Sequence, residues 1–154
     1  MKLIIKNEPI FFDNKDFQTI QIRILFPFHR KEKDIAKYNI LPSLINPYCK
    51  KYPTEEEFAM IRDEYYILGC YCGSNTIGNV SYFSFNMTIP DSNTLKKDYL
   101  EEQFSILHEM IYNPKEKNNH FIKEDVEREI NNLRNGIEKN LNDAESYAMI
   151  QSKE

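Results

Sequence analysis

The 154-residue chain lacks several features that mark large classes of proteins. It has no long hydrophobic run: the apolar stretch 20–28 is interrupted by Gln21 and Arg23 and is too short to cross a bilayer. It has no excess of basic residues either, because the formal net charge is −4 and charges of both signs are mixed along the chain. No signal-peptide pattern stands at its start. These absences predict a cytoplasmic protein with no membrane and no nucleic-acid partner.

Cysteine and histidine are both scarce, at three residues each. Three cysteines cannot all pair within one chain, and Cys70 and Cys72 are too close for the usual C-x-x-C metal motif. Buried thiols are therefore expected, with a redox or metal role as the alternative. No two of His29, His108 and His120 have a spacing that grips a metal from one helix face. We expect all three to be surface histidines.

Catalytic motifs are also missing. His108 and Glu109 begin an H-E-x-x-H pattern, but Tyr112 stands where the second histidine is required. The chain has no G-x-S-x-G nucleophile elbow and no G-x-x-x-x-G-K phosphate loop. No nucleophile, base and orienting group come together in the sequence.

What is present is the composition of one globular domain, with 41% hydrophobic and 29% charged residues. Strands are predicted at residues 3–5, 18–27, 70–72 and 80–89, with a turn-rich stretch at 73–79. Alternation in the second and fourth strands predicts one shared core face. Its residues are Ile20, Ile22, Ile24, Phe26, Phe83, Phe85, Met87 and Ile89.

Helices are predicted at 35–44, where Pro42 interrupts the pattern, at 55–68, before Pro114, and near the end of the chain. Thr54 and Glu57 form a capping-box pattern, and Gly69 is placed to end that second helix. The apolar stripes expected to be buried are Phe58, Ile61, Tyr65 and Leu68, then Leu100, Phe104, Leu107 and Ile111, and finally Val126, Ile130, Leu133, Ile137 and Leu141.

The order β-β-α-α-β-β-α-α predicts an α+β fold, an antiparallel or mixed sheet with helix pairs on one face. We expect residues 1–154 to form a single domain. The segment 146–150 is typical of the start of a further packed helix, so we also expect the chain to be part of a longer protein.

This layout resembles the N-terminal part of the insulinase, or pitrilysin, family of zinc peptidases. The similar stretches are residues 17–26, 35–54, 55–69 with the following hairpin, and 121–129. They cover nearly the whole chain but about the first third of a typical family member. The resemblance implies an N-terminal piece of a protein with two homologous halves that close around a peptide.

The zinc-binding residues of that family are not matched here. The family places H-x-x-E-H on its first helix and a further glutamate on a later helix. Aligned from Thr54, the two histidine positions are Ile40 and Leu44, and the glutamate position is Ser43. Glu129 matches a recurrent acidic residue, and the later ligand falls on Gly136. None of the four substituted residues can bind zinc or activate water, so we expect no metal and no cofactor.

The resemblance also implies a peptide-binding edge strand, because the family adds its substrate to the sheet beside the zinc helix. The equivalent residues are Cys70, Tyr71, Cys72, Gly73, Ser74 and Asn75. Strand addition depends on backbone groups and does not need the metal. An ordinary hairpin strand is the alternative.

Together these features predict a non-catalytic, insulinase-like subunit that binds a peptide or pairs with an active zinc-peptidase relative, as a homo- or hetero-oligomer. Two alternatives stay open. The chain is part of an active zinc peptidase whose catalytic site lies outside this sequence, or it is an unrelated α+β binding module.

Overall fold

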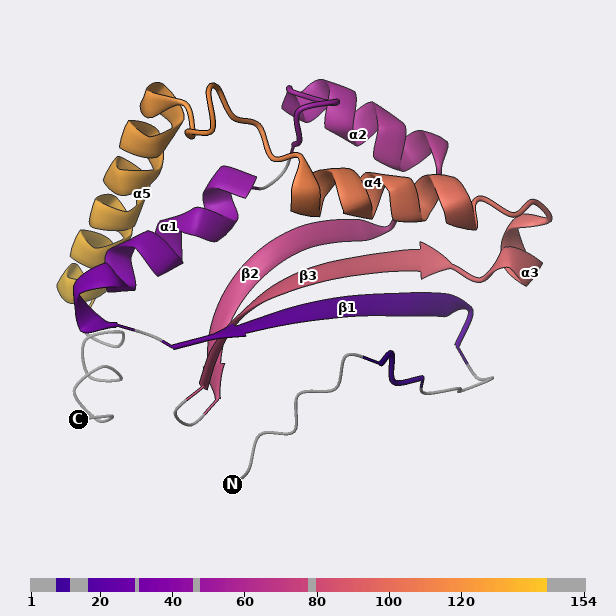
Figure 1. The fold of residues 1–154 in the computed structure, drawn as a ribbon, viewed down its shortest axis with the longest axis horizontal. Helices are drawn as coiled ribbons and strands as arrows, with labels where there is room; N and C mark the ends of the chain where they lie inside the picture. Colours follow the sequence, from indigo (N-terminus) through magenta and orange to yellow (C-terminus); the bar gives the residue numbers. More distant parts are fainter. Residues whose placement is uncertain (1–7, 12–16, 30, 46–47, 78–79, 144–154) are drawn as a thin grey trace.

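Figure 1 shows the fold as a computed structural model, which describes residues 8–11, 17–29, 31–45, 48–77 and 80–143. The predicted strand at 3–5 and the apolar segment at 146–150 lie outside the described residues. The helices and strands, in chain order, are β1 (Thr19–Phe28), η1 (Glu32–Asp34), α1 (Ile35–Ile45), α2 (Glu55–Glu64), β2 (Gly69–Ile77), β3 (Val80–Pro90), α3 (Ser92–Leu95), α4 (Leu100–Tyr112) and α5 (Lys123–Asn142).

The described strands form one antiparallel sheet in the order β1-β3-β2. Helices α1, α2 and α4 lie over one face of this sheet (Figure 1). The α+β class and the antiparallel arrangement are therefore confirmed. No helix in the described part of the chain is both long and apolar enough to span a bilayer.

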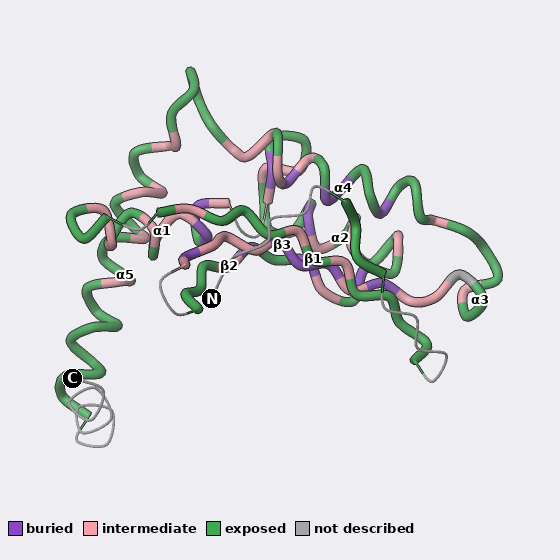
Figure 2. Tube along the Cα trace, turned by 60° about the horizontal axis from the view of Figure 1, so that its bottom comes forward, coloured by how far each residue is buried: buried purple, intermediate pink, exposed green. Residues whose placement is uncertain are grey.

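The register between β1 and β3 confirms the predicted core face. Ile22 lies opposite Met87 and Ile24 lies opposite Phe85, so their side chains point to the same side. Phe85 and Met87 are buried, whereas Ile20 and Phe26 are 42% and 41% exposed. Ile20 and Phe26, near the two ends of β1, lie on the core face but are only partly covered, because the described helices contact mainly β2 and β3. Figure 2 shows β1 coloured as exposed or intermediate.

Helix α2 begins as predicted and ends earlier. The Thr54 hydroxyl accepts a hydrogen bond from the Glu57 N–H, and the Glu57 carboxylate accepts from the Thr54 N–H, which completes the capping box. The helix ends at Glu64, before Gly69, because Tyr66 adopts a positive φ of 54° and turns the chain. Leu68 is consequently 63% exposed and does not belong to the buried stripe.

The strand β2 is much longer than predicted. Residues 73–77, expected to be a turn, continue the ladder with β3 as far as the Ile77–Val80 pair. Their composition of glycine, serine, asparagine and threonine is typical of turns, but full pairing with β3 overrides that local preference. The hairpin connection is therefore shorter than the one the sequence suggested.

Helix α4 is rotated relative to its predicted stripe. Its buried residues are Gln103, Ile106, Leu107 and Met110, whereas Leu100 and Phe104 are 40% and 44% exposed. Gln103 tolerates burial because its side-chain amide donates a hydrogen bond to the Tyr65 carbonyl oxygen at 2.7 Å. A buried polar residue of this kind cannot be recognised from hydrophobic spacing.

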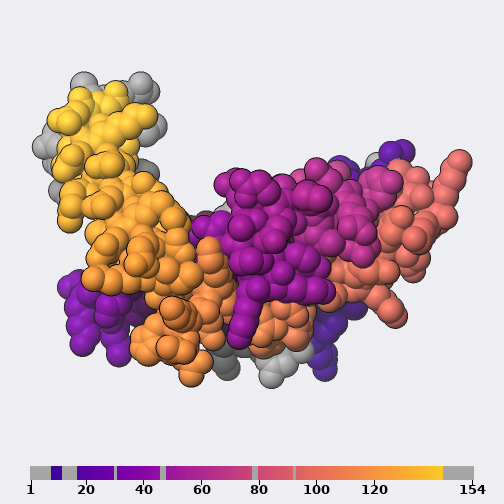
Figure 3. Space-filling view, turned by 90° about the horizontal axis from the view of Figure 1, so that it is seen from above, coloured from indigo at the N-terminus to yellow at the C-terminus, as the bar shows by residue number. Residues whose placement is uncertain are grey.

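Helix α5 has no buried residue, and its far part extends away from the rest of the molecule (Figure 3). Val126 and Leu133 of its predicted stripe are half-buried. Ile130, Ile137 and Leu141 are 41%, 52% and 53% exposed, so the expected burial of the whole stripe is wrong. Helix α5 is amphipathic as predicted, but the other described elements pack only against the first half of its apolar face.

Candidate functional site

Helix α1 carries three of the positions that the family resemblance assigns to zinc chemistry. It packs against both β2 and α5, so these positions lie between the sheet edge and the last helix. Leu44 is buried, Ile40 is half-buried and Ser43 is exposed. Isoleucine and leucine offer no lone pair to a metal, and a serine hydroxyl is a poor general base.

The fourth position, Gly136, lies in α5 with open space around it. A Cβ built on Gly136 meets no atom within 4 Å. Packing against the described residues therefore does not require glycine here. Within the described residues, no three of the His, Cys, Asp and Glu side chains gather in an arrangement that could hold a metal ion.

The three histidines are exposed, as predicted. The ring of His108 packs on Tyr112 with 4.6 Å between ring centroids. The Nδ1 atom of His120 lies 2.7 Å from the Asn118 carbonyl oxygen. Both contacts are local, and neither histidine faces a second metal-binding group.

The predicted peptide-binding residues, Cys70 to Asn75, lie in β2 at one edge of the sheet. In the part of the chain that the structure describes, β2 pairs with β3 and no strand pairs with its other edge. Cys70 and Cys72 are buried against α4 and the sheet, whereas Tyr71, Ser74 and Asn75 are exposed. The second half of β2, residues 74–77, is thus the more open part of this edge.

One hydrogen bond reveals which backbone groups face the open edge. The Thr76 N–H donates to the side-chain oxygen of Asn75 at 2.8 Å, so it points away from β3. Hydrogen-bonding direction alternates along an antiparallel strand. The backbone groups of Ser74 therefore also point outward, toward the side on which a further strand could pair.

The cysteines are buried, as interpreted from the sequence. Burial raises the pKa of Cys70 to about 12 and that of Cys72 to about 11, and it also raises the pKa of Cys49. The Cys70 thiol donates to the Met110 sulfur at 3.0 Å. Because a thiolate is the reactive form, these cysteines are poor nucleophiles and metal ligands at neutral pH.

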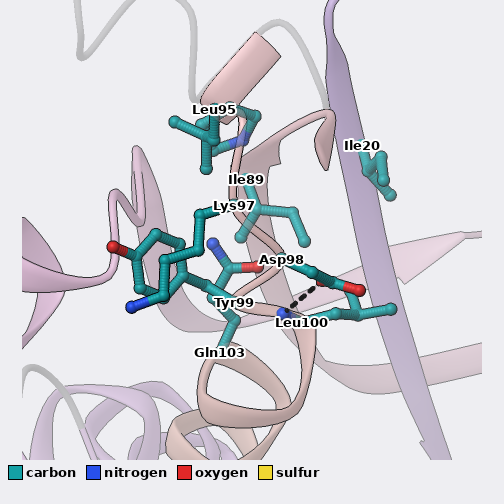
Figure 4. A pocket seen from close by; sticks show the side chains of 9 residues that line it. Ile20, Ile89, Leu95, Lys97, Asp98, Tyr99, Leu100 and Gln103 are labelled. Carbon is teal, nitrogen blue, oxygen red and sulfur yellow. Dashed lines mark hydrogen bonds between the residues drawn. The ribbon is translucent and has the colours of Figure 1, made fainter. Parts of the chain in front are cut away.

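The cavities on the described surface include a small one and a larger one. The smaller, of about 60 Å³, lies where β1 and β3 meet the segment before α4, and it is lined by Ile20, Ile89 and Tyr99 among others (Figure 4). The Asp98 carboxylate there accepts a hydrogen bond from the Leu100 N–H at 3.0 Å, which orders the start of α4. This cavity has the volume of one or two water molecules, too little for a substrate.

The larger cavity, of about 240 Å³, lies between α1 and the hairpin end of β2 and β3. Its lining residues are Phe28, Tyr38, Asn39, Ser74, Asn75, Thr76 and Ser81. Of these, only Ser74 and Asn75 were predicted as site residues. The other five, Phe28, Tyr38, Asn39, Thr76 and Ser81, were missed because they come from four separate elements and share no motif.

An α+β domain with an open sheet edge is the class that this geometry defines. A crystal structure described as that of a conserved protein from Enterococcus faecalis V583 has a similar fold, with a TM-score of 0.81 and 23% sequence identity. The match covers 90% of this chain and 33% of that one, so the chain spans about a third of the length of its structural neighbour. No protein-family model matches the chain, and no curated protein is significantly similar to it. A likeness at this level of identity concerns the fold alone.

Proposed function

We propose that this chain is a non-catalytic, insulinase-like subunit that binds an extended peptide as an added strand on β2. The observation that carries the proposal is the outer edge of β2, where the backbone groups of Ser74 and Thr76 face away from β3 and no described strand pairs with them. Strand addition obtains its affinity from such backbone groups, and pockets for alternate side chains supply specificity. The residues of this edge carry no charge and include no proline.

The absence of catalysis in this proposal rests on residue chemistry. If Ile40, Ser43, Leu44 and Gly136 occupy the family's metal positions, the chain has neither zinc ligands nor a base to activate water. Elemental analysis of the purified protein is expected to find no stoichiometric zinc. One tightly held zinc per chain, or proteolysis that a chelator abolishes, would contradict this part of the proposal.

A partner subunit is the second part of the proposal. The exposed apolar residues Ile137 and Leu141 on α5, together with Ile20 and Phe26 on β1, support association with another polypeptide. We propose a homodimer in isolation and a complex with a catalytic relative in the cell. Sedimentation at micromolar concentration tests the first statement, and purification from the native cell tests the second. A monomer recovered alone would contradict both.

Peptide binding is tested most directly by Ser74→Pro. Proline removes the outward N–H of residue 74, and the preceding Gly73 leaves room for the ring. The ladder with β3 does not use this N–H, so the fold should persist. Ser74→Ala keeps the N–H and serves as the matched control. Binding of labelled extended peptides should be lost in Ser74→Pro and retained in Ser74→Ala; equal binding by both variants would exclude strand addition at this edge.

A further inference from the structure

The larger cavity lies directly beside the open half of β2. Ser74 and Thr76 line it, and the same two residues present outward backbone groups. Their side chains share a face with Cys72, the face that the helices cover. A strand added to β2 would therefore run along the mouth of the cavity and point its helix-side side chains toward it.

The walls of the cavity are aromatic on one side and neutral and polar on the other. Phe28 contacts Tyr38 and Phe83 with ring centroids 4.6 and 4.5 Å apart, which forms an aromatic cluster at the base of α1. Across from it, the hydroxyl oxygens of Thr76 and Ser81 lie 2.9 Å apart and form a hydrogen bond to one another. These hydroxyls therefore do not require a hydrogen bond from a ligand.

No charged residue is among the seven that line the cavity. A charged ligand group placed there would lose hydration and find no ion-pair partner. An aromatic or large aliphatic side chain would instead bury its surface against Phe28 and Tyr38, and the cavity of about 240 Å³ has room for one such group.

We infer that this cavity is a specificity pocket that selects, in a peptide added to β2, a bulky uncharged side chain at the position facing Ser74 and Thr76. The inference rests on the proposed strand addition and extends it by naming the class of peptide. It predicts that the protein distinguishes peptides by the size and charge of the side chain at one position, and that it accepts many different side chains at the other positions.

The test uses nine-residue peptides of serine, threonine and lysine with one central guest residue, labelled for fluorescence anisotropy. The guests are phenylalanine, leucine, alanine, aspartate and lysine. The phenylalanine and leucine peptides should bind about tenfold more tightly than the alanine peptide, since partial burial of a large apolar side chain is worth on the order of 1.4 kcal/mol. The aspartate peptide should bind most weakly.

A protein variant separates the pocket from the edge. Asn39→Phe fills the cavity from α1 without changing the backbone of β2, and Ala36→Phe places the same side chain on an exposed position of α1 that does not line the cavity. In Asn39→Phe the phenylalanine and alanine peptides should bind with similar affinity, because the cavity that distinguishes them is filled. In Ala36→Phe the preference should persist.

The possible results distinguish the specificity pocket from the proposed strand addition on which it rests. Equal binding of all five peptides to the unmodified protein, or a preference for a charged guest, would overturn the specificity pocket and leave strand addition intact. A phenylalanine preference that survives in Asn39→Phe would place the selecting site elsewhere. Failure of every peptide to bind would overturn both.

Discussion

β1 and β2 are the two outer strands of the described sheet, and both pair with β3, but their free edges differ in chemistry. The β1 edge carries the charged Arg23, and Pro27, which has no N–H, lies at a position whose backbone points outward. The β2 edge has neither charge nor proline. Charges and proline are the usual means by which proteins prevent unwanted strand pairing.

The two edges are therefore not equally open to a further strand. On β1, Pro27 has no N–H, so the edge offers one hydrogen-bond donor fewer to an incoming strand. The charged Arg23 side chain on the same strand donates a 2.9 Å hydrogen bond to the Asn86 side chain. On β2, the Asn75 side chain accepts a hydrogen bond from the Thr76 N–H, and the strand Gly69–Ile77 contains no charged residue and no proline. A protected edge beside an unprotected one favours β2 as the side on which a partner strand is added.

The largest expected effect concerns Phe85, which lies opposite Ile24 of β1 and Cys72 of β2 and so supports both outer strands. Phe85→Ala should lower the free energy of unfolding by about 3–5 kcal/mol, because the side chain is buried and its removal leaves a cavity. Phe26→Ala, at the exposed end of β1, should lower it by about 1–2 kcal/mol. Denaturant titrations measure both, and equal losses would show that β1 is as well covered as β3.

The next effect appears at high pH and concerns β2. Burial raises the pKa of Cys70 to about 12 and that of Cys72 to about 11, from an ordinary value of 9.0. Above pH 9 the unfolded chain ionises these thiols while the folded chain keeps them neutral. Stability is therefore complete below pH 9 and declines as the pH rises toward 11–12, by roughly 1–2 kcal/mol per thiol at pH 10.5.

Unfolding titrations at pH 8 and pH 10.5 measure this loss. The double variant Cys70→Ala, Cys72→Ala is the control for the other groups that ionise in the same range, and its stability should depend less on pH. An identical pH dependence in both proteins would show that the thiols of β2 do not account for the loss.

A smaller effect is expected from opening the protected edge. Pro27→Ala gives β1 an outward N–H and should change the stability by no more than about 0.5 kcal/mol. It should increase self-association in sedimentation velocity, because the β1 edge then offers an unbroken row of backbone groups. Unchanged sedimentation would indicate that Arg23 or neighbouring chain protects β1 without the proline.

The smallest effect is expected at Asn75. Asn75→Ala removes the exposed hydrogen bond to the Thr76 N–H, worth about 0.5 kcal/mol, and leaves that N–H free for an incoming strand. The affinity for a peptide added to β2 should rise about twofold. Asn93→Ala, at an exposed position away from the sheet, is a suitable control. A weaker affinity in Asn75→Ala would mean that the asparagine contacts the peptide.

Local signals in the sequence predicted much of the fold. Alternation in 18–27 and 80–89 predicted the core face of both strands, and the Thr54–Glu57 capping box located the start of α2. The rotation of α4 was not predictable, because burial of Gln103 depends on the Tyr65 carbonyl of another segment. The length of β2 was hidden as well, since its pairing with β3 outweighs the turn preference of Gly73, Ser74 and Asn75.

The candidate site was only partly predictable for a related reason. The edge position of residues 70–75 followed from a family resemblance, and the structure places them at an edge. The cavity beside them is formed by β1, α1, β2 and β3 together, so the contribution of Tyr38 and Asn39 appears only once α1 is packed on the sheet. A hydrophobic stripe, like that of α5, shows that a face needs covering but not what covers it.

The lack of buried residues in α5 has a consequence for local dynamics. The second half of α5 has exposed apolar residues at Ile137 and Leu141 and contains Gly136, a poor helix former, so it obtains little stability from packing or from helix propensity. Its backbone amides should therefore exchange with solvent through local opening, far faster than those of β3. A partner that covered Ile137 and Leu141 would slow this exchange, so amide exchange in α5 would detect such an assembly.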